Sequence, residues 1–253
     1  MKITLLGTSH GDPTLTRQNS SSLIECEGKY YLIDAGEGAS TSLIRLGLRP
    51  SMISAVFITH MHGDHTNGLA LFADQARKYR KLNPGHDTEI YFPDERAEIP
   101  FRQWLSVIGY TANQDVRIHT IHPGKFFDDG VLQVEAFPTR HMVWSHKDES
   151  LPSYAFLISG EGKKVLFTGD LSGDFSDFPV EMARRADVMI CEIVHFKPEY
   201  ALPIFRELKL KQVVFNHLSN FAQTPEGQKE IAGLCKDLPY PIHFGFDGYA
   251  FVP

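Results

Sequence analysis

Four residues with metal-binding side chains stand within six positions of the sequence: His60, His62, Asp64 and His65. After a strand, the alternating His60 and His62 can face one way, and a turn at Gly63 can direct Asp64 and His65 toward a second point. Imidazole nitrogens and carboxylate oxygens are the donors that borderline divalent ions such as Zn²⁺ accept when thiolates are absent. This loop therefore predicts a site for two adjacent metal ions.

The segments around the loop predict an α/β protein. Apolar runs alternate with helix-length amphipathic segments, which is typical of a layered α/β domain rather than a helical bundle. Residues 55–58 are apolar throughout, as expected of a strand covered on both faces, and they lead to His60. Trp104 is expected on the buried side of the helix predicted over residues 99–107. Strands are expected over residues 2–6, 21–25, 30–33, 55–58, 116–121, 131–137, 154–158, 165–167, 188–191, 212–215, 242–244 and 249–252, and helices over residues 39–46, 66–81, 99–107, 180–186, 200–208 and 225–235.

Each half of the chain is first rich in strands and then alternates strands with helices. This order is compatible with two similar half-units on one core, and no linker separates them. With 253 residues and 42% apolar composition, the chain can bury a sizeable core. We therefore expect one domain over residues 1–253.

Composition excludes several classes of protein. The three cysteines are widely spaced and form no CxxC pair, which excludes a disulfide framework and a cysteine-rich zinc finger. No apolar run approaches the ~18 residues of a membrane helix, and the N-terminus turns polar too soon for a signal peptide, so we expect a soluble cytoplasmic protein without membrane contact. The net charge of −6 argues against general nucleic-acid binding, although a local patch could override it.

The metal-binding loop resembles the HxHxDH motif of the metallo-β-lactamase superfamily, and the segments around it are similar to that family as well. Residues 31–36 (YLIDAG) resemble the strand and DxG element that precede the motif, and His141 follows 76 residues after His65, where the family places its next histidine. Residues 167–170 (FTGD) resemble the Gly-Asp pair that ends a strand in that family. Residues 215–219 (FNHLS) resemble the segment that carries the family's last metal ligand. The resemblance covers about residues 2–252 and implies a four-layer αββα sandwich.

The resemblance also implies a dinuclear site and the distribution of its ligands. The expected metal is zinc, with manganese or iron as alternatives. Asp34 is expected to orient a ligand histidine, although an aspartate before glycine also simply forms turns. The implied ligands are His60, His62 and His141 for one metal, Asp64, His65 and His217 for the other, and Asp170 as the bridge between them.

Several segments are similar to the ribonuclease Z-like and cyclic-phosphodiesterase-like branches of the superfamily. They are residues 6–14 (LGTSHGDPT), 17–21 (RQNSS), 152–156 (PSYAF) and 246–248 (FDG), with Ala155 in place of a usual glycine. The chain departs from ribonuclease Z because no Gly/Pro-rich arm is evident between residues 165 and 217 and because no HST segment carries a catalytic histidine. Processing of tRNA is therefore doubtful.

His195 is a candidate for that missing catalytic histidine. It follows the strand expected over residues 188–191, where it could protonate a leaving oxygen with Glu192 fixing its tautomer; a structural histidine is the alternative. Trp144, three residues after His141, could wall a substrate pocket, and His10 and His146 are expected in loops near the site. The basic run over residues 77–81 could guide a nucleic acid, but a solvated helix face is the preferred interpretation.

These observations predict a dinuclear metal-dependent hydrolase that cleaves a phosphodiester with a hydroxide shared by the two metals. Asp64, Asp170 and His195 are the predicted catalytic residues. Two divalent cations and the two carboxylates would leave a charge of about +2 at the site, which suits a small-molecule or nucleotide-like anionic ester. An acyl-bond hydrolase acting on a lactone, thioester or lactam and a non-catalytic metal-binding protein are the alternatives, and a homodimer is left open.

Overall fold

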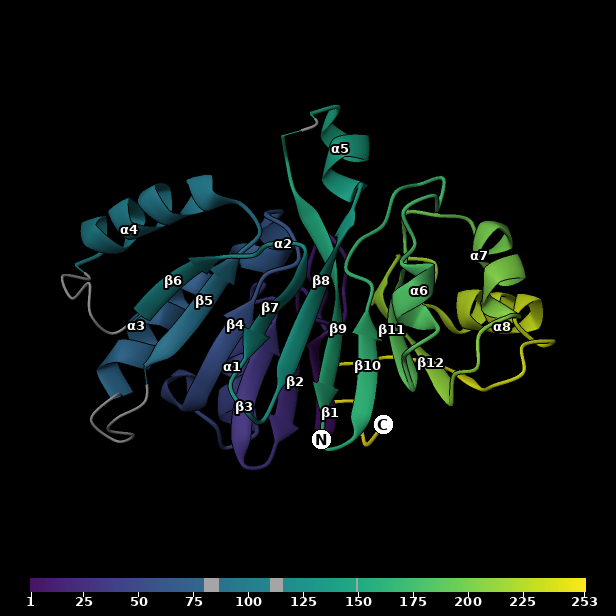
Figure 1. Ribbon diagram of the computed structural model, residues 1–253, viewed down its shortest axis with the longest axis horizontal. Helices are drawn as coiled ribbons and strands as arrows, with labels where there is room; N and C mark the ends of the chain where they lie inside the picture. The colour runs from purple at the N-terminus through teal and green to yellow at the C-terminus, as the bar shows by residue number, and fades with distance from the viewer. Residues whose placement is uncertain (80–86, 110–115, 149) are drawn as a thin grey trace.

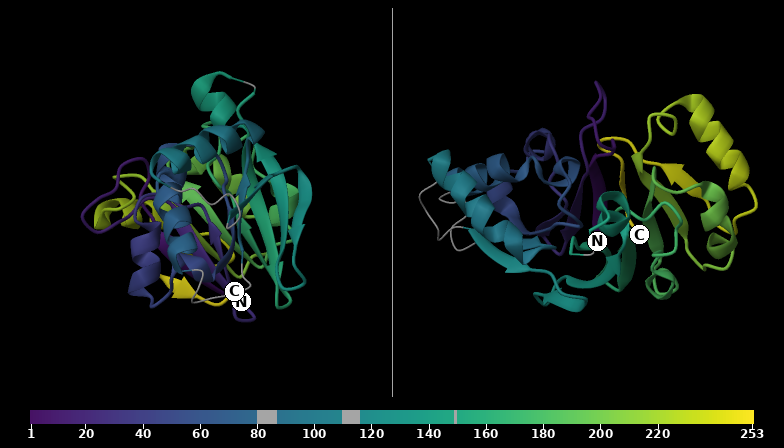
Figure 2. Two further views of the ribbon diagram at one scale, coloured as in Figure 1. Left: turned by 90° about the vertical axis from the view of Figure 1, so that its left-hand side faces the viewer. Right: turned by 90° about the horizontal axis from the view of Figure 1, so that it is seen from above.

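The computed structural model describes residues 1–79, 87–109, 116–148 and 150–253 and arranges them in four layers, helices–sheet–sheet–helices (Figures 1 and 2). Within these residues there are two sheets of seven strands each. In Figure 1, β3 to β6 with α3 and α4 lie on the left, β10 to β12 with α6 to α8 lie on the right, and strands of the two sheets overlap in the middle. This is the αββα sandwich that the resemblance implied.

The N-terminal sheet begins with antiparallel strands and continues with parallel ones. Strands β1, β2 and β3 pair antiparallel, whereas β3, β4, β5 and β6 are parallel to one another. In spatial order the strands are β14 (Ala250–Phe251), β1 (Lys2–Gly7), β2 (Ser21–Cys26), β3 (Lys29–Ile33), β4 (Ile53–Phe57), β5 (Thr88–Phe92) and β6 (Val116–Thr120).

The C-terminal sheet repeats this scheme, as the two similar halves of the sequence predicted. Strands β7 to β10 pair antiparallel, and β10 to β13 are parallel. In spatial order they are β13 (Ile242–Phe244), β12 (Gln212–Leu218), β11 (Val188–Ile193), β10 (Lys163–Phe167), β9 (Ser153–Gly160), β8 (Gln133–Thr139) and β7 (Gly124–Asp128).

Helices form the outer layers, and α5 projects from the end of the β8–β9 pair (Figure 1). In α3 the buried residues recur at helical spacing, at Leu69, Phe72, Ala73 and Ala76. The helices are α1 (Ala39–Arg45), α2 (Gly63–Thr66), α3 (Leu69–Tyr79), α4 (Glu98–Val107), α5 (His141–His146), α6 (Val180–Ala183), α7 (Pro198–Phe205) and α8 (Pro225–Leu234), with 3₁₀ turns η1 (Pro50–Met52) and η3 (Glu95–Ala97).

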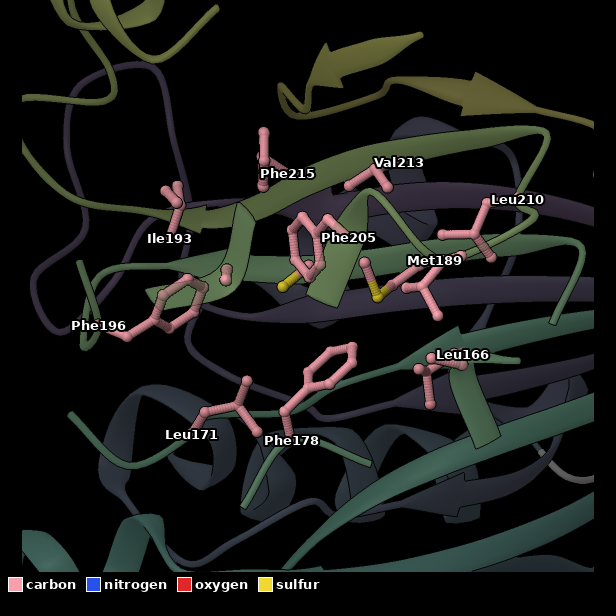
Figure 3. Close-up of a cluster of buried hydrophobic side chains, with 14 of the residues drawn as sticks. Leu166, Leu171, Phe178, Met189, Ile193, Phe196, Phe205, Leu210, Val213 and Phe215 are labelled. Atoms are coloured by element: carbon pink, nitrogen blue, oxygen red, sulfur yellow. The ribbon is translucent and has the colours of Figure 1, made fainter. Parts of the chain in front are cut away.

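Three groups of buried apolar side chains separate the four layers. One lies between the N-terminal sheet and α1, α3 and α4, and a second joins the facing sides of both sheets. The third lies between the C-terminal sheet and the helices beside it; Phe205 of α7 packs there among residues of β11 and β12 (Figure 3). Leu171 and Phe196 belong to this third group, so the backbone next to Asp170 and His195 is anchored in the core.

Most predicted elements are present, and the differences have physical causes. The sequence interpretation lacked β5, β7 and α5, which are short and contain polar residues. Trp104 was expected in the core, but its side chain is 57% exposed because α4 buries only Leu105.

The C-terminal end of the helix predicted over residues 66–81 lies outside the described residues, as do Arg80 and Lys81 of the basic run. In the described part of that run, Lys78 forms an ion pair with Asp74 at 2.6 Å, and Arg77 approaches the same carboxylate at 3.4 Å. A solvated helix face therefore accounts for Arg77 and Lys78. Among the described residues, none of the helices has the length and apolar character needed to cross a bilayer.

Candidate metal centre

All seven residues predicted as metal ligands come from one edge of the sandwich. His60 follows β4, His141 follows β8, and Asp170 follows β10. These strands end at the same edge as β12, because the strands of each sheet that lead to the site run in the same direction. Asp64 and His65 lie on α2, which begins directly after His62. The carboxyl ends of parallel strands are where α/β proteins commonly build ligand sites.

The structure places His217 differently from the sequence prediction. It was expected just beyond a strand ending at Phe215, but β12 continues to Leu218. Glu192 pairs with Asn216 and Ile193 with Leu218, so His217 is the extra residue of a β-bulge, with a φ of 51°. A bulge re-aims its side chain, and here it directs the imidazole toward the metal-binding loop.

The side-chain nitrogens of these histidines surround one carboxylate oxygen, Oδ2 of Asp170. Nε2 of His217 lies 3.2 Å from it, and Nε2 of His65 lies 3.6 Å away. Nε2 of His60 and Nε2 of His141 each lie 3.7 Å away. Two groups of donor atoms therefore share Asp170, the arrangement that the prediction of a bridging carboxylate requires.

The first group is formed by His60, His62, His141 and Asp170, whose donor atoms all lie within 4.8 Å of one another. Nδ1 of His62 is 3.0 Å from Nε2 of His60 and 3.1 Å from Nε2 of His141. One ring nitrogen offers either one proton or one lone pair, so it cannot serve both contacts well as hydrogen bonds. Two nitrogens bound to one tetrahedral zinc ion are about 3.3 Å apart, and a shared cation accounts for the spacing.

The second group contains Asp64, His65 and His217. Oδ2 of Asp64 lies 3.6 Å from Nε2 of His65 and 3.8 Å from Nε2 of His217. The backbone N–H of Gly11 donates a hydrogen bond to the same oxygen at 2.8 Å, which fixes the carboxylate. Nε2 of His65 is buried and lacks a hydrogen-bond partner among the described residues, which is a costly state unless a cation binds there.

Hydrogen bonds to the opposite ring nitrogens fix the tautomers of His60 and His65. The hydroxyl of Thr59 donates to the Asp34 carboxylate at about 3.0 Å and can then accept from Nδ1 of His60 at 3.1 Å. Nδ1 of His65 donates to Oδ2 of Asp34 at 2.8 Å, the orienting contact that the sequence predicted for Asp34. Both rings therefore turn Nε2 toward the site, where a metal ligand needs it. Without a metal ion, the carboxylates of Asp170 and Asp34 outweigh burial and raise the pKa of His65 well above 6.5.

His141 and His217 are held in the same way from other elements. Nδ1 of His141 faces the backbone carbonyl of Leu171 at 3.3 Å, and because a carbonyl only accepts, this nitrogen carries the proton. Nδ1 of His217 lies 2.7 Å from the buried hydroxyl of Ser20. Ser20 was not singled out from the sequence, although it lies within the segment 17–21 that was similar to the phosphodiesterase branches.

The electrostatic environment keeps the histidines of the first group neutral and the Asp170 carboxylate ionised, which suits the binding of a cation. Burial and the neighbouring His65 hold the pKa of His60 well below 6.5, and burial together with His141 lowers the pKa of His62 to about 4. Burial also lowers the pKa of His141. For the carboxyl of Asp170, burial acts to raise the pKa, but the surrounding imidazoles outweigh it and hold that pKa well below its usual value.

His195 lies at the rim of the centre beside both groups. Its Nδ1 is 3.0 Å from Oε1 of Glu192 and 3.8 Å from Oδ2 of Asp170. Burial acts to lower the pKa of His195, but the hydrogen bond and charge of Glu192 and the charge of Asp170 raise it to about 9. The same Glu192 accepts hydrogen bonds from the backbone N–H groups of Leu171 and Val194, so it is rigidly placed.

The remaining predicted neighbours lie around the mouth of the centre. His146, expected in a loop, ends helix α5, and its Nε2 is 2.7 Å from Nε2 of His62. The ring of His10 meets His217 edge to face at 6.2 Å. The ring of Trp144 is 42% exposed and lies 6.5 Å from His195, and a Cβ atom on Gly173 would come within 2.5 Å of that ring.

These donors fit a divalent metal. They consist of imidazole nitrogens with fixed tautomers, two carboxylates, and a buried nitrogen whose lone pair has no other use in the described structure. They contain no thiolate, because Cys26, Cys191 and Cys235 are free cysteines buried elsewhere. The structure therefore supports divalent metal binding at this site.

Comparisons with known proteins agree with this fold and site. The family model described as Anti-Pycsar protein Apyc1 matches residues 1–230. The ribonuclease BN of Cronobacter sakazakii is 34% identical over 293 residues, covering 92% of this chain and 93% of that protein. The crystal structure of the metallo-β-lactamase fold protein YhfI from Bacillus subtilis superposes with a TM-score of 0.79, covering 99% of this chain and 98% of that one at 20% identity.

Other relatives match over a smaller part of their length. The ribonuclease Z of a Picosynechococcus species is 39% identical over 147 residues, covering 56% of this chain and 44% of that protein, and the chain spans 48% of a second ribonuclease Z, from Crocosphaera subtropica. The chain thus spans about half the length of these relatives. From the family model and the full-length similarity to ribonuclease BN, the chain belongs to the family described as Anti-Pycsar protein Apyc1, is a relative of the ribonuclease Z and BN proteins, and has the metallo-β-lactamase fold.

Proposed function

We propose that the protein is a phosphodiesterase with two metal ions, most simply two Zn²⁺ in a cytoplasmic enzyme. The observation that carries this proposal is the shared position of Asp170, whose Oδ2 faces imidazole nitrogens of both ligand groups. In this proposal, His60, His62 and His141 hold one ion, and Asp64, His65 and His217 hold the other. Such a pair of ions lowers the pKa of water to about 7 and neutralises charge on phosphoryl oxygens.

The protein's own residues supply the remaining functions. Asp64 and Asp170 are the anionic ligands, so two divalent ions leave a net charge of about +2 that attracts an anionic ester. Asp34 and Ser20 hold the rings of His65 and His217 in the orientation that faces the ions. These contacts fix the geometry of the ligands before the substrate binds. Such preorganisation is the main source of electrostatic stabilisation of the transition state in many enzymes.

His195 is the proposed general acid. Glu192 accepts a hydrogen bond from Nδ1, and Nε2 on the other side of the ring is the group that can protonate a leaving oxygen. Burial acts to lower the pKa of His195, but the hydrogen bond and charge of Glu192 raise it, and this contact favours the protonated ring that a general acid needs. The ring of His195 lies at the rim of the centre, with Nδ1 at 3.8 Å from Oδ2 of Asp170, and so stands beside the site where an ester bond would break.

The substrate is proposed to be a small phosphodiester rather than tRNA. The relatives are named ribonucleases, but this chain lacks an inserted arm in the described segment between β10 and β12, whose helices α6 and α7 have four and eight residues. Both helices pack on the third core group and are not part of an extension (Figure 1). The family description, Anti-Pycsar protein, does not state a substrate.

The test is hydrolysis of bis(4-nitrophenyl) phosphate by the metal-loaded protein. Asp64→Ala and Asp170→Ala should each reduce kcat/KM at least about 100-fold, whereas Asp128→Ala, which removes an exposed carboxylate on β7, should not. Undiminished turnover in both ligand variants would disprove the proposal. The same preparations should be assayed on a lactone and on a tRNA precursor; faster turnover of the lactone would favour acyl hydrolysis, and cleavage of the RNA would favour tRNA processing.

A further inference from the structure

His62 differs from the other ligand histidines in the ring nitrogen that faces the site. Four of them turn Nε2 toward Oδ2 of Asp170: His60, His65, His141 and His217. His62 instead turns Nδ1 inward, 3.0 Å from Nε2 of His60 and 3.1 Å from Nε2 of His141. Its Nε2 faces outward and lies 2.7 Å from Nε2 of His146.

Metal binding through Nδ1 gives this outer contact a fixed direction. A neutral imidazole carries one proton, on one of its two nitrogens. A metal ion takes the lone pair of the nitrogen that it binds, so binding through Nδ1 of His62 leaves the proton on Nε2. The nearest described acceptor is Nε2 of His146, which has a lone pair when its own proton is on Nδ1. In the metal-bound protein, His62 therefore donates and His146 accepts.

Helix α5 holds the ring of His62 from two sides. The ring centroid of His141, the first residue of α5, lies 5.0 Å from that of His62. The ring centroid of His146, the last residue of the helix, also lies 5.0 Å from it. One short helix thus supplies a ligand of the first group and the partner that orients a second ligand of that group.

The start of α5 is fastened to the loop that follows β10 and contains Asp170. The backbone N–H of Arg140 donates to Oδ2 of Asp177 at 2.6 Å. Oδ1 of the same buried carboxylate accepts a hydrogen bond from the hydroxyl of Ser172 at 2.8 Å. The helix and the bridging carboxylate are therefore held in one arrangement.

Contacts farther along α5 fix the position of its end. The indole of Trp144 packs on Gly173, where a Cβ atom would come within 2.5 Å of the ring. The backbone N–H of Lys147, just past the helix, donates to the carbonyl of Val143 at 2.8 Å. His146 lies between these two contacts, so its place beside His62 is set by the backbone.

The partner of His62 differs from the partners of the other ligand histidines in its exposure. The others are buried groups: the hydroxyls of Thr59 and Ser20, the carboxylate of Asp34 and the backbone carbonyl of Leu171. The side chain of His146 is exposed. The first group therefore contains one ligand whose orientation depends on a surface helix.

We propose that His146 is a positioning residue for the first metal site: it accepts a hydrogen bond from Nε2 of His62 and so holds Nδ1 of that ring toward the metal. This inference rests on the ligand assignment of the proposed function and adds the hydrogen-bond acceptor of its remaining histidine. It does not depend on the reaction, so it is tested through metal binding.

Zinc affinity is measured by competition with a chromophoric chelator in two backgrounds that separate the sites. Asp64→Ala keeps the first group complete, whereas His60→Ala keeps the second group complete. His146→Leu, which removes the acceptor, should weaken binding about 10–100-fold in the first background and leave it unchanged in the second.

Two further variants separate the hydrogen bond from packing. His146→Gln places a carbonyl oxygen where Nε2 was, so it should restore most of the affinity that His146→Leu loses in the Asp64→Ala background. Val143→Ala shortens an apolar side chain on the same helix and removes no hydrogen-bonding side-chain group, so it should leave the affinity unchanged in both backgrounds.

Proton NMR of the Co²⁺-loaded Asp64→Ala protein tests the hydrogen bond itself. The N–H protons of ligand imidazoles are shifted by the paramagnetic ion and are seen in water only when they exchange slowly. The first group has three histidines, so three such signals are expected. His146→Leu should lose one of them through exchange with water, and His146→Gln should keep all three.

Unchanged zinc affinity in His146→Leu, or a His146→Gln variant as weak as His146→Leu, would overturn the proposal. Equal weakening in both backgrounds would assign α5 a general structural role and would also overturn it. If the Asp64→Ala protein binds no zinc, the ligand assignment fails and the proposal fails with it. If zinc binding changes as expected but no phosphodiester is cleaved, the reaction fails while the role of His146 is supported.

Discussion

The buried hydroxyl of Ser20 lies 2.7 Å from Nδ1 of His217, and this contact ties the first loop of the chain to the last predicted ligand. The loop is itself fixed from the C-terminal end of the fold. Arg17 donates hydrogen bonds to the Thr8 hydroxyl at 2.6 Å and to the carbonyl of Gly245 at 2.7 Å, and Thr8 donates to Asp247. The same loop fixes Asp64 through the N–H of Gly11. Two of the three ligands in the second group therefore depend on it.

Replacing Ser20 with alanine should weaken the second metal site selectively. Without the hydroxyl, the His217 ring loses the contact that orients it, and loss of such a contact typically reduces metal affinity about 10–100-fold. Isothermal titration of the metal-free protein with Zn²⁺ should show one site of unchanged affinity and one weakened site. Ser21→Ala is the matched control, because Ser21 is also buried but donates to the backbone carbonyl of Asp34. Equal weakening of both sites would contradict this assignment.

Gly36 should not tolerate a side chain. A Cβ atom there would lie 2.2 Å from the backbone oxygen of Asp64 and 2.7 Å from Cβ of Asn19, so Gly36→Ala must displace both the ligand loop and the first loop. We expect a loss of about 1–3 kcal/mol in the free energy of unfolding, measured by urea denaturation.

Gly233→Ala is the control for this substitution. Gly233 lies within α8, and no heavy atom is within 4 Å of its added Cβ atom. Alanine is favoured over glycine in a helix, so this variant should gain about 0.5–1 kcal/mol. Equal stability of the two variants would show that the contacts at Gly36 are not restrictive.

The sequence predicted most of the site because its residues follow apolar strands. The position of His60 directly after the strand expected over residues 55–58 was enough to place it at the sheet edge, whereas Asp170 was identified through the resemblance, and the structure brings both to the same point. The resemblance to a known superfamily supplied the pairing of His141 and His217 with distant segments, which spacing alone does not contain. Local pattern could not predict the bulge at His217, because a bulge depends on the register against β11.

The sequence also could not predict that the side chain of Trp104 is exposed. A helical pattern identifies an apolar side of α4 at Phe101, Trp104 and Leu105, but it does not say how deeply the helix sits on the sheet. In the structure only Leu105 reaches the core, and the other apolar side chains line a pocket or face water. The same pattern therefore describes a core helix and a helix that forms one wall of a pocket.

Removing the metal ions should lower the stability of the protein markedly. Ligands that bind only the folded state stabilise it by about 2.7 kcal/mol when present at 100 times their Kd. Without cations, Nε2 of His65 is left buried without a partner among the described residues. Differential scanning calorimetry with and without a chelator should show a fall in Tm that added Zn²⁺ restores, and a Tm that is insensitive to the chelator would contradict metal binding.

In the metal-free protein, His195 and His62 should titrate far apart. NMR of the imidazole resonances should give a pKa of about 9 for His195 and about 4 for His62. Glu192→Gln should lower the pKa of His195 toward or below 6.5, because Glu192 provides the hydrogen bond and the largest charge that raise it. An unchanged pKa in this variant would contradict the role of Glu192.

These two shifts also contribute to the pH dependence of the metal-free fold, in the same directions as the raised pKa of His65 and the lowered pKa values of His60 and His141. The folded-state pKa of His195 lies above its usual value of about 6.5, so its contribution is complete below pH 6.5 and is lost as the pH rises through about 9. The pKa of His62 lies below that value, so the unfolded chain binds the proton first, and stability is lost as the pH falls from about 6.5 through 4. The free energy of unfolding from urea titrations should therefore decline on both sides of about pH 6.5, and Glu192→Gln should reduce the decline on the alkaline side, because Glu192 raises the pKa of His195.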